Sequence, residues 1–121
     1  MATTTNNGQP NFDTYVKESD LEKDGVSNIL TSTTGTVHHV RLVNGANITH
    51  FKMYDAYSIT YGTTDPCFVV PVAADTTMSV QCRQGITFST AATMAAARAG
   101  GTGSGGDTQP SLLAVTIFGG A

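Results

Sequence analysis

The stretch TVHHVRLVNGANITHFKMYD, residues 36–55, alternates apolar and polar residues on both sides of the dipeptide Asn44-Gly45. Asn-Gly is favoured in tight hairpin turns, because both residues tolerate positive φ. The stretch therefore predicts two β-strands joined by a hairpin. The pairing parity places Val40 on the same face as Phe51 and Met53. This apolar face is expected to point into the core.

The opposite face of the predicted hairpin gathers basic side chains in an otherwise acidic protein. The formal net charge is −3, and two of the six Lys and Arg residues would lie on this face. A tyrosine there would add an aromatic anchor of the kind that protein interfaces favour. We expect this strip to meet carboxylates of a neighbouring subunit or partner, with binding that weakens in salt. The strip consists of His39, Arg41, His50, Lys52 and Tyr54.

Short apolar or alternating runs, separated by Gly, Asn, Asp and Pro, continue from Val26 to the end of the chain. This pattern predicts an all-β protein, and eight runs match the strands of a two-sheet jelly roll. The expected fold is an eight-stranded, jelly-roll-like β-sandwich. The expected strands are 26–31, 36–43, 47–54, 67–73, 77–82, 86–89, 92–98 and 112–118, around a core of Val40, Leu42, Phe51, Met53, Val69, Val80, Ile86, Phe88, Val115 and Ile117.

Two neighbouring segments have strong local preferences. TAATMAAARAGG, residues 90–101, favours a helix by propensity, because alanine is the best helix former. GGTGSGGD, residues 100–107, has the composition of a flexible loop.

Residues 1–25 form a polar segment that we expect to be an arm on a sandwich domain spanning 26–121. DTYVKESDLEKDG, residues 13–25, holds nearly half of the charges in the chain. The arm is either a solvated tail or an ordered clasp on a neighbour. If it is a clasp, its contact residues are Tyr15, Val16 and Leu21.

Cys67 and Cys82 flank a second predicted hairpin. A four-residue loop, 73–76, puts Pro71 opposite Met78 at a position that needs no N–H, with Cys67 opposite Cys82. In this register Pro71 belongs on an edge strand or at a bulge. We expect a pair of half-buried free thiols, because proteins made in the cytoplasm keep their thiols reduced. A disulfide is the alternative.

The composition argues against several partners. A net charge of −3 does not suit a protein that binds duplex nucleic acid. No apolar run approaches the roughly eighteen residues of a membrane span, and the first residues lack the basic and apolar regions of a secretory signal. We expect neither a nucleic acid nor a membrane partner.

No motif points to catalysis or to a cofactor. Gly103-Ser104-Gly105 lacks the flanking strand and helix of a nucleophile elbow. His38, His39 and His50 are the only histidines, and no Cys or carboxylate completes a metal-ligand set with them. We expect a protein that is not an enzyme and holds no metal or cofactor. A sugar site lined by Tyr54, Tyr57 and Tyr61 is the alternative, because aromatic faces stack on pyranose rings.

Three segments carry a family resemblance: FKMYDA at 51–56, GTTDPCFVVPVAADTT at 62–77 and GITFSTAATMAAA at 85–97. Across about residues 36 to 100 the chain resembles small β-sandwich virion proteins of tailed bacteriophages, of the decoration or cement type. The resemblance implies a strand at 92–98, against the helix propensity.

The resemblance also implies a role. It implies a non-enzymatic structural virion protein, made in the host bacterial cytoplasm, that binds the major capsid protein on the capsid exterior and stabilises the phage head. We expect a homotrimer, which suits the threefold positions of such shells. Close packing between protomers could use Ala92, Ala95, Ala96 and Ala97. The alternative is a carbohydrate-binding β-sandwich module of a phage tail or fibre.

Overall fold

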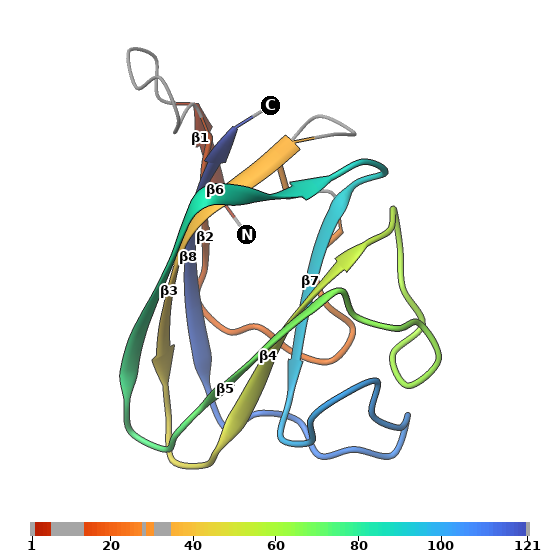
Figure 1. Ribbon diagram of the computed structural model, residues 1–121. Coiled ribbons are helices and arrows are strands. Elements are labelled where there is room, and N and C mark those ends of the chain that lie inside the picture. Colours follow the sequence, from red (N-terminus) through yellow and green to blue (C-terminus); the bar gives the residue numbers. More distant parts are fainter. Residues whose placement is uncertain (1, 6–13, 28, 31–34, 121) are drawn as a thin grey trace.

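Two antiparallel sheets face each other across one hydrophobic core in the computed structural model (Figure 1). The structure describes residues 2–5, 14–27, 29–30 and 35–120. The larger sheet has five strands in the order β1-β2-β8-β3-β6, and the smaller sheet has three in the order β5-β4-β7. The prediction of an all-β sandwich is therefore confirmed. The strands are β1 (Ala2–Thr5), β2 (Thr14–Glu18), β3 (Gly35–Asn44), β4 (Thr49–Asp55), β5 (Phe68–Val72), β6 (Thr77–Phe88), β7 (Ala92–Ala97) and β8 (Leu113–Gly120).

One of the expected strands is reduced to a single bridge to β7. β2-β8-β3-β6 face β5-β4-β7, and Val26 forms a single antiparallel bridge with Met94 of β7. Only this bridge remains of the expected strand 26–31 within the described residues, and residues 28 and 31 lie outside them. β1 is an additional strand beside β2.

The chain crosses from one sheet to the other at Asn44-Gly45, so the expected hairpin is wrong. β3 pairs with β6 and β8, whereas β4 pairs with β5 and β7. Neither residue of the dipeptide has positive φ. The Asn44 side chain donates to the carbonyl oxygen of Val72 at 3.0 Å, and the Gly45 N–H donates to that of Leu112 at 2.8 Å. The crossing lets the apolar faces of β3 and β4 bury each other, which one flat hairpin cannot do.

This crossing preserves the predicted core but separates the predicted strip. The inward side chains of β3 and β4 are fully buried, as the parity predicted: Val40, Leu42, Phe51 and Met53. The outward side chains now point in opposite directions. His39 and Arg41 lie on the outer face of the larger sheet, while the outward residues of β4 lie on that of the smaller sheet. The five residues of the strip therefore do not form one surface.

β5 and β6 also lie in different sheets, so the register expected for the cysteines is wrong. β5 pairs with β4 and β6 pairs with β3, and the chain crosses between the sheets through residues 73–76. Asp75 in this connection has a φ of 54°. Pro71 lies on an edge strand, as its missing N–H predicted.

β7 is a strand despite its alanine content. All six of its side chains are buried, and it pairs with β4 from Ala92 to Ala97. The strand is stabilised by hydrogen bonds to β4 and by burial between the core and the overlying loops. These effects outweigh the helix propensity, which differs between residues by less than about 1 kcal/mol. The strand at 92–98 is confirmed.

The other core predictions hold except at Val69. The two strands expected at 77–82 and 86–89 are one strand, β6, with a register shift against β3 between Val37 and His39. Val69 pairs with the outward Lys52, and Val70 and Val72 face the core in its place. The remaining expected core residues are buried or packed against the core: Val80, Ile86, Phe88, Val115 and Ile117.

The segment expected to be an arm is largely part of the sandwich. β2 pairs with β8 along its whole length, and Val16 and Leu21 are 0% and 1% exposed within the core. The Leu21 N–H also donates to the carbonyl oxygen of Leu113 at 2.9 Å. Residues 1 and 6–13 lie outside the described residues. No boundary separates the described part of 14–25 from the rest of the fold.

Candidate interaction surface

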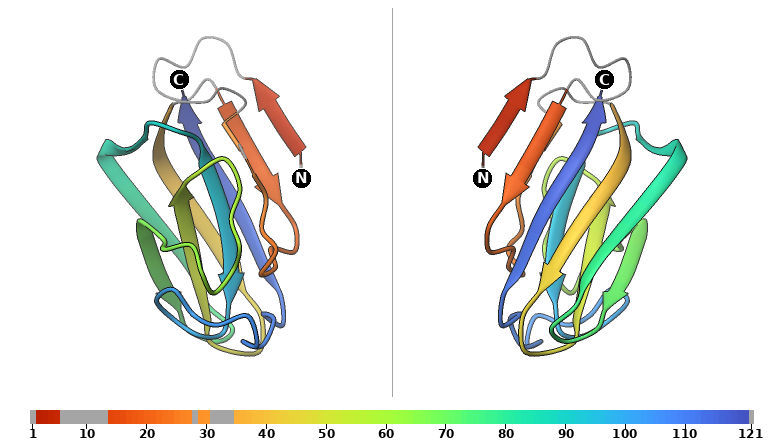
Figure 2. Two further views of the ribbon diagram at one scale, coloured as in Figure 1. Left: turned by 90° about the vertical axis from the view of Figure 1, so that its right-hand side faces the viewer. Right: turned by 90° about the vertical axis from the view of Figure 1, so that its left-hand side faces the viewer.

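A row of aromatic rings crosses the outer face of the larger sheet. Figure 2 shows the backbone of this face at the right. The strand register places Tyr15 of β2 beside Phe118 of β8, and Phe118 beside His39 of β3. The ring centroids are 5.1 Å apart for Tyr15 and Phe118 and 5.7 Å apart for Phe118 and His39. Both spacings lie in the range of favourable tilted aromatic contacts. All three rings are half-buried.

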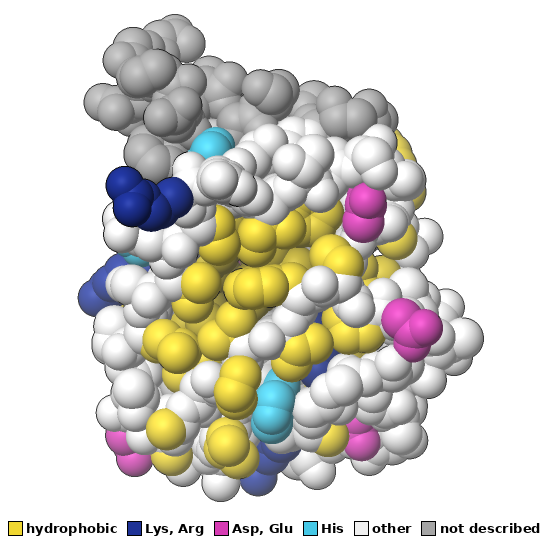
Figure 3. All heavy atoms as spheres, viewed as in Figure 1, with side chains coloured by type: hydrophobic (Ala, Val, Ile, Leu, Met, Phe, Trp, Pro, Cys, Tyr) yellow, Lys and Arg dark blue, Asp and Glu magenta, His cyan; other side chains and the backbone are white. Residues whose placement is uncertain are grey.

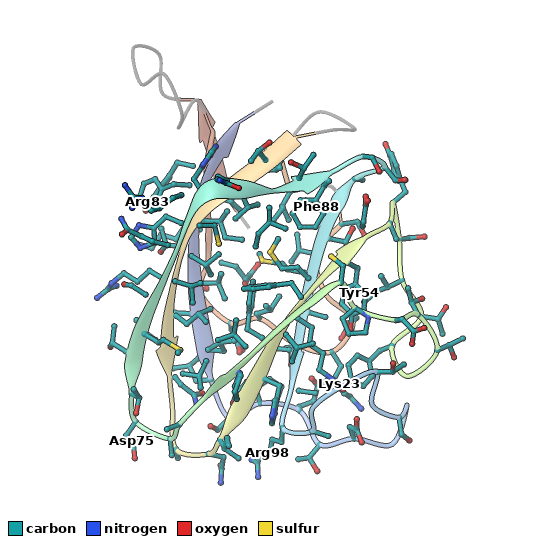
Figure 4. The ribbon with its side chains drawn as sticks, viewed as in Figure 1. Lys23, Tyr54, Asp75, Arg83, Phe88 and Arg98 are labelled. Carbon is teal, nitrogen blue, oxygen red and sulfur yellow. The ribbon has the colours of Figure 1, made fainter. Side chains whose placement is uncertain are left out.

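Cations surround this row. Lys17 and Arg41 occupy the neighbouring row on either side of Thr116, and both are exposed. Arg83 of β6 is exposed and points away from the sandwich on the same side (Figure 4). These are three of the six Lys and Arg residues of the chain. We call this surface the basic face; it consists of Tyr15, Lys17, His39, Arg41, Arg83 and Phe118.

The basic face has almost no acidic counterpart on its own sheet. Among the strands of the larger sheet, only β2 contains an acidic residue, Glu18. Glu18 pairs with Val115, which points into the core, so the side chains of Glu18 and Lys17 lie on different faces of the sheet. Within the described strands, the cations of this face therefore have no acidic neighbour that shares their face, and most acidic residues of the sequence lie outside the strands.

The outer face of the smaller sheet is covered by two loops, 56–67 and 98–112, as Figure 2 shows at the left. Lys52 of β4 is fully buried beneath them. Its Nζ donates to the Tyr61 hydroxyl at 2.7 Å and lies 4.7 Å from the ring centroid. The Tyr61 hydroxyl donates to Oδ2 of Asp107 at 2.9 Å. Lys23 reaches the same loop, with Nζ donating to the carbonyl oxygen of Gly105 at 3.0 Å.

These contacts fix the glycine-rich segment that composition predicted to be flexible. The Ser104 N–H donates to Asp107 Oδ2 at 2.8 Å. A side chain at Gly103 would clash with the Tyr61 hydroxyl, and Gly103 also has a φ of +76°. Glycine is thus required there by close approach and by backbone conformation. The loop is tied to the sheet through Lys52, Tyr61 and Asp107.

Burial lowers the pKa of Lys52, and the charge of Asp107 partly opposes this effect. The pKa of Tyr61 is raised, by burial first and then by its hydrogen bond to Asp107. Hydrogen bonding from the Ser104 N–H lowers the pKa of Asp107. A lysine with a lowered pKa is a better nucleophile. Lys52, however, has no solvent exposure, so a substrate could not reach it. Its hydrogen bond to Tyr61 instead holds the loop against the sheet.

The other outward residues of β4 are also unavailable as a charged strip. His50 is half-buried, with Nδ1 2.9 Å from the carbonyl oxygen of Arg98. Tyr54 is fully buried, and its hydroxyl has no hydrogen-bond partner in the described structure. Burial raises the pKa of Tyr54 to about 12. His50, Lys52 and Tyr54 therefore support the loops.

Replacing Tyr54 by phenylalanine is expected to leave the protein as stable as the wild type or to stabilise it by about 1 kcal/mol. A buried hydroxyl without a partner costs roughly 1–3 kcal/mol, and Tyr54→Phe removes it without leaving a cavity. Urea denaturation measures the difference. The matched control is Tyr61→Phe, which breaks the hydrogen bonds to Lys52 and Asp107 and should destabilise. A loss of more than about 1 kcal/mol for Tyr54→Phe would contradict the assignment.

The two cysteines are free thiols associated with the edge strands of different sheets. Cys67 is exposed and directly precedes β5, and Cys82 is half-buried in β6. Burial raises the pKa of both thiols, and the charge of Asp55 adds to the effect at Cys67. A raised thiol pKa reduces the thiolate fraction and hence the reactivity. Neither cysteine has the environment of a nucleophile.

The alanines expected to serve a trimer contact are buried within the chain itself. Ala92, Ala95, Ala96 and Ala97 are at most 1% exposed. Contacts between protomers therefore need another surface.

Within the described residues, no three His, Cys, Asp or Glu side chains are close enough to hold a metal ion. The same part of the chain contains no helix long and apolar enough to span a membrane. No family model, curated protein or solved structure matches the chain.

Several residues of the candidate surface and of the loops were not predicted from the sequence. Phe118 and Lys17 could have been found by parity, since each alternates with a core residue, Ile117 or Val16. Nothing in the sequence indicates the hydrogen bond between Tyr61 and Asp107, because the two residues are far apart in sequence and lie in loops without periodicity. Alternation along the sequence also predicts that Lys52 points outward from its sheet, which is correct, but it does not indicate the loops that cover Lys52.

Proposed function

We propose that this protein is a non-enzymatic structural virion protein that decorates the exterior of a tailed-phage capsid. It is made in the bacterial cytoplasm and stabilises the phage head by attaching to the major capsid protein. Its sequence resemblance to decoration proteins supports the proposal, and the basic face provides a surface for attachment.

The basic face is the observation that carries the proposal. It is a sheet surface with an aromatic row, flanked by three cations, on a chain of net charge −3. Aromatic residues and arginine are enriched in protein interfaces. Complementary charge guides association and weakens with ionic strength. The partner that fits is an acidic protein surface, and repeated copies of such a surface are what a capsid would offer.

Reversing the charge of two cations on the basic face is expected to reduce capsid occupancy. Lys17→Glu combined with Arg41→Glu changes exposed side chains, so the fold should persist. We expect occupancy on capsids of the encoding phage, measured by cosedimentation, to fall at least about tenfold, with a smaller effect at high salt. Lys52→Glu is unsuitable, because it would place a carboxylate in the interior.

The control adds negative charge elsewhere. Ser58→Glu with Thr63→Glu places two carboxylates on exposed positions of the loop that follows β4. This variant should keep its occupancy. Equal occupancy of the double reversal and the wild type would overturn the docking role of the basic face, and no cosedimentation of the wild type would overturn the decoration role.

The sugar-binding alternative has less support. Tyr54 is buried and the Tyr61 hydroxyl is engaged with Lys52, so of the three tyrosines only Tyr57, which is 56% exposed, offers its ring freely. A glycan array tests this alternative directly, since specific binding would favour it.

A further inference from the structure

The two sides of the sandwich differ, one being closed by the chain and the other open. On the closed side, Val26 bridges Met94, and the Ile29 N–H donates to the carbonyl oxygen of Ala92 at 2.9 Å. On the other side, β5 and β6 are the edge strands of their sheets and are linked only through 73–76. This open side faces the viewer in Figure 1, between β5 and β6.

The open side exposes apolar side chains that belong to the core. Phe68, Val80 and Ile86 pack against the core but are only partly buried, and Met78 is 37% exposed. Figure 3 shows hydrophobic side chains gathered there as a continuous surface. Inward residues of the central strands, such as Val40 and Phe51, are fully buried. Exposed apolar patches of this kind mark interaction surfaces.

The backbone of β6 is the edge that can accept another strand. Thr77–Gln81 pairs with β3 in an unbroken register, and no described strand lies on its other side. β5 carries Pro71, which cannot donate a ladder hydrogen bond and so protects that edge. β6 has no proline, and residues 77–82 contain no charged residue. An uncharged, proline-free edge lacks two of the usual barriers to strand addition.

We propose that two copies of this chain, in place of the homotrimer expected from the sequence, associate through the open side, with β6 of one copy antiparallel to β6 of the other across a two-fold axis. A two-fold contact brings each surface against itself, so apolar surfaces are compatible and charged surfaces repel. The uncharged stretch of β6 and the apolar open side meet this condition, whereas the basic face does not. The larger sheet then continues across both copies.

The pairing places the two basic faces side by side, because a two-fold axis perpendicular to the sheet keeps the same face on the same side. Two linked faces bind a repetitive acidic surface more tightly than one, since the second contact becomes intramolecular. The dimer itself does not depend on what the basic face binds. It is tested with the purified protein alone, so its failure is distinct from failure of the decoration role.

Light scattering coupled to size-exclusion chromatography tests the proposal. The wild type is expected at twice the monomer mass of 12.6 kDa. Met78→Asp places a charge on the open side at an already exposed position and should weaken dimerisation at least about tenfold. The matched control, Tyr57→Asp, alters another exposed apolar residue, in the loop after β4, and should remain dimeric.

Amide hydrogen exchange supplies the second measurement. Exchange in residues 77–82 of the wild type should slow as the concentration rises, because strand pairing protects the free edge of β6. Met78→Asp should show no such concentration dependence. A monomeric or trimeric wild type, a dimeric Met78→Asp, or unprotected β6 amides in a dimer would each overturn the two-fold β6 contact.

Discussion

Replacing Lys52 by alanine is expected to lower the free energy of unfolding by about 2–5 kcal/mol, the range for removing a long buried side chain. The change removes the fully buried stem beneath the loops and the hydrogen bond to Tyr61 at 2.7 Å. It also leaves a cavity between β4 and the glycine-rich loop. Urea denaturation gives the difference, and faster amide exchange in 98–107 would show that the loop has loosened.

Lys52→Met separates the packing of the stem from its charge. Methionine keeps much of the volume, and the Tyr61 hydroxyl keeps Asp107 as a partner, so the loss should stay within about 1.5 kcal/mol. Lys17→Ala, at an exposed position, is the surface control and should change stability by at most about 0.5 kcal/mol. A wild-type stability for Lys52→Ala would contradict the role of Lys52 in holding the loop.

The free energies of unfolding of the wild type and of Lys52→Met should also differ in their pH dependence. Burial lowers the pKa of Lys52, so the folded protein releases this proton at a lower pH than the unfolded chain. The unfolded state then binds more protons in this range, and stability rises with pH. As the pH rises toward the ordinary lysine pKa of 10.5, the wild type should gain stability relative to Lys52→Met. A stability difference between the wild type and Lys52→Met that stays constant, or shifts in favour of Lys52→Met, as the pH rises would contradict the lowered pKa.

Deletion of residues 1–25 is expected to cost more than about 5 kcal/mol, which is comparable to the whole stability of a domain of this size. The deletion removes β2, which pairs with β8, together with the buried side chains of Val16 and Leu21. The truncated protein should lose its cooperative unfolding transition in circular dichroism. Deletion of a solvated arm would leave the transition unchanged.

A shorter deletion provides the control. Removing residues 1–5 takes only the outermost strand β1, which pairs with β2 alone, and should cost much less. Leu21→Ala alone should cost about 2–5 kcal/mol if the side chain is a core residue. An unfolding midpoint like that of the wild type for the 1–25 deletion would contradict the placement of β2. Capsid-binding experiments should therefore use point variants of the basic face.

The sequence by itself determined which side chains of each strand face inward. Alternation has a period of two in any strand, so Val40 and Leu42 are inward whether the chain then turns back or crosses to another sheet. The all-β class follows from the same local pattern. Pro71 likewise required an edge, since a missing N–H is a local property.

Only the tertiary structure decided which strands are neighbours. The Asn44-Gly45 dipeptide favours a hairpin locally, but burying the apolar faces of β3 and β4 against each other requires a crossing between sheets. That crossing moved His39 and Arg41 to one outer surface and Lys52 to the other, where distant loops bury it. β7 is a strand for a similar reason, because burial of its six side chains outweighs a weak local preference for helix. The local sequence decides whether a side chain points into or out of the sandwich. Which other side chains lie on the same surface depends on contacts between segments far apart in the sequence.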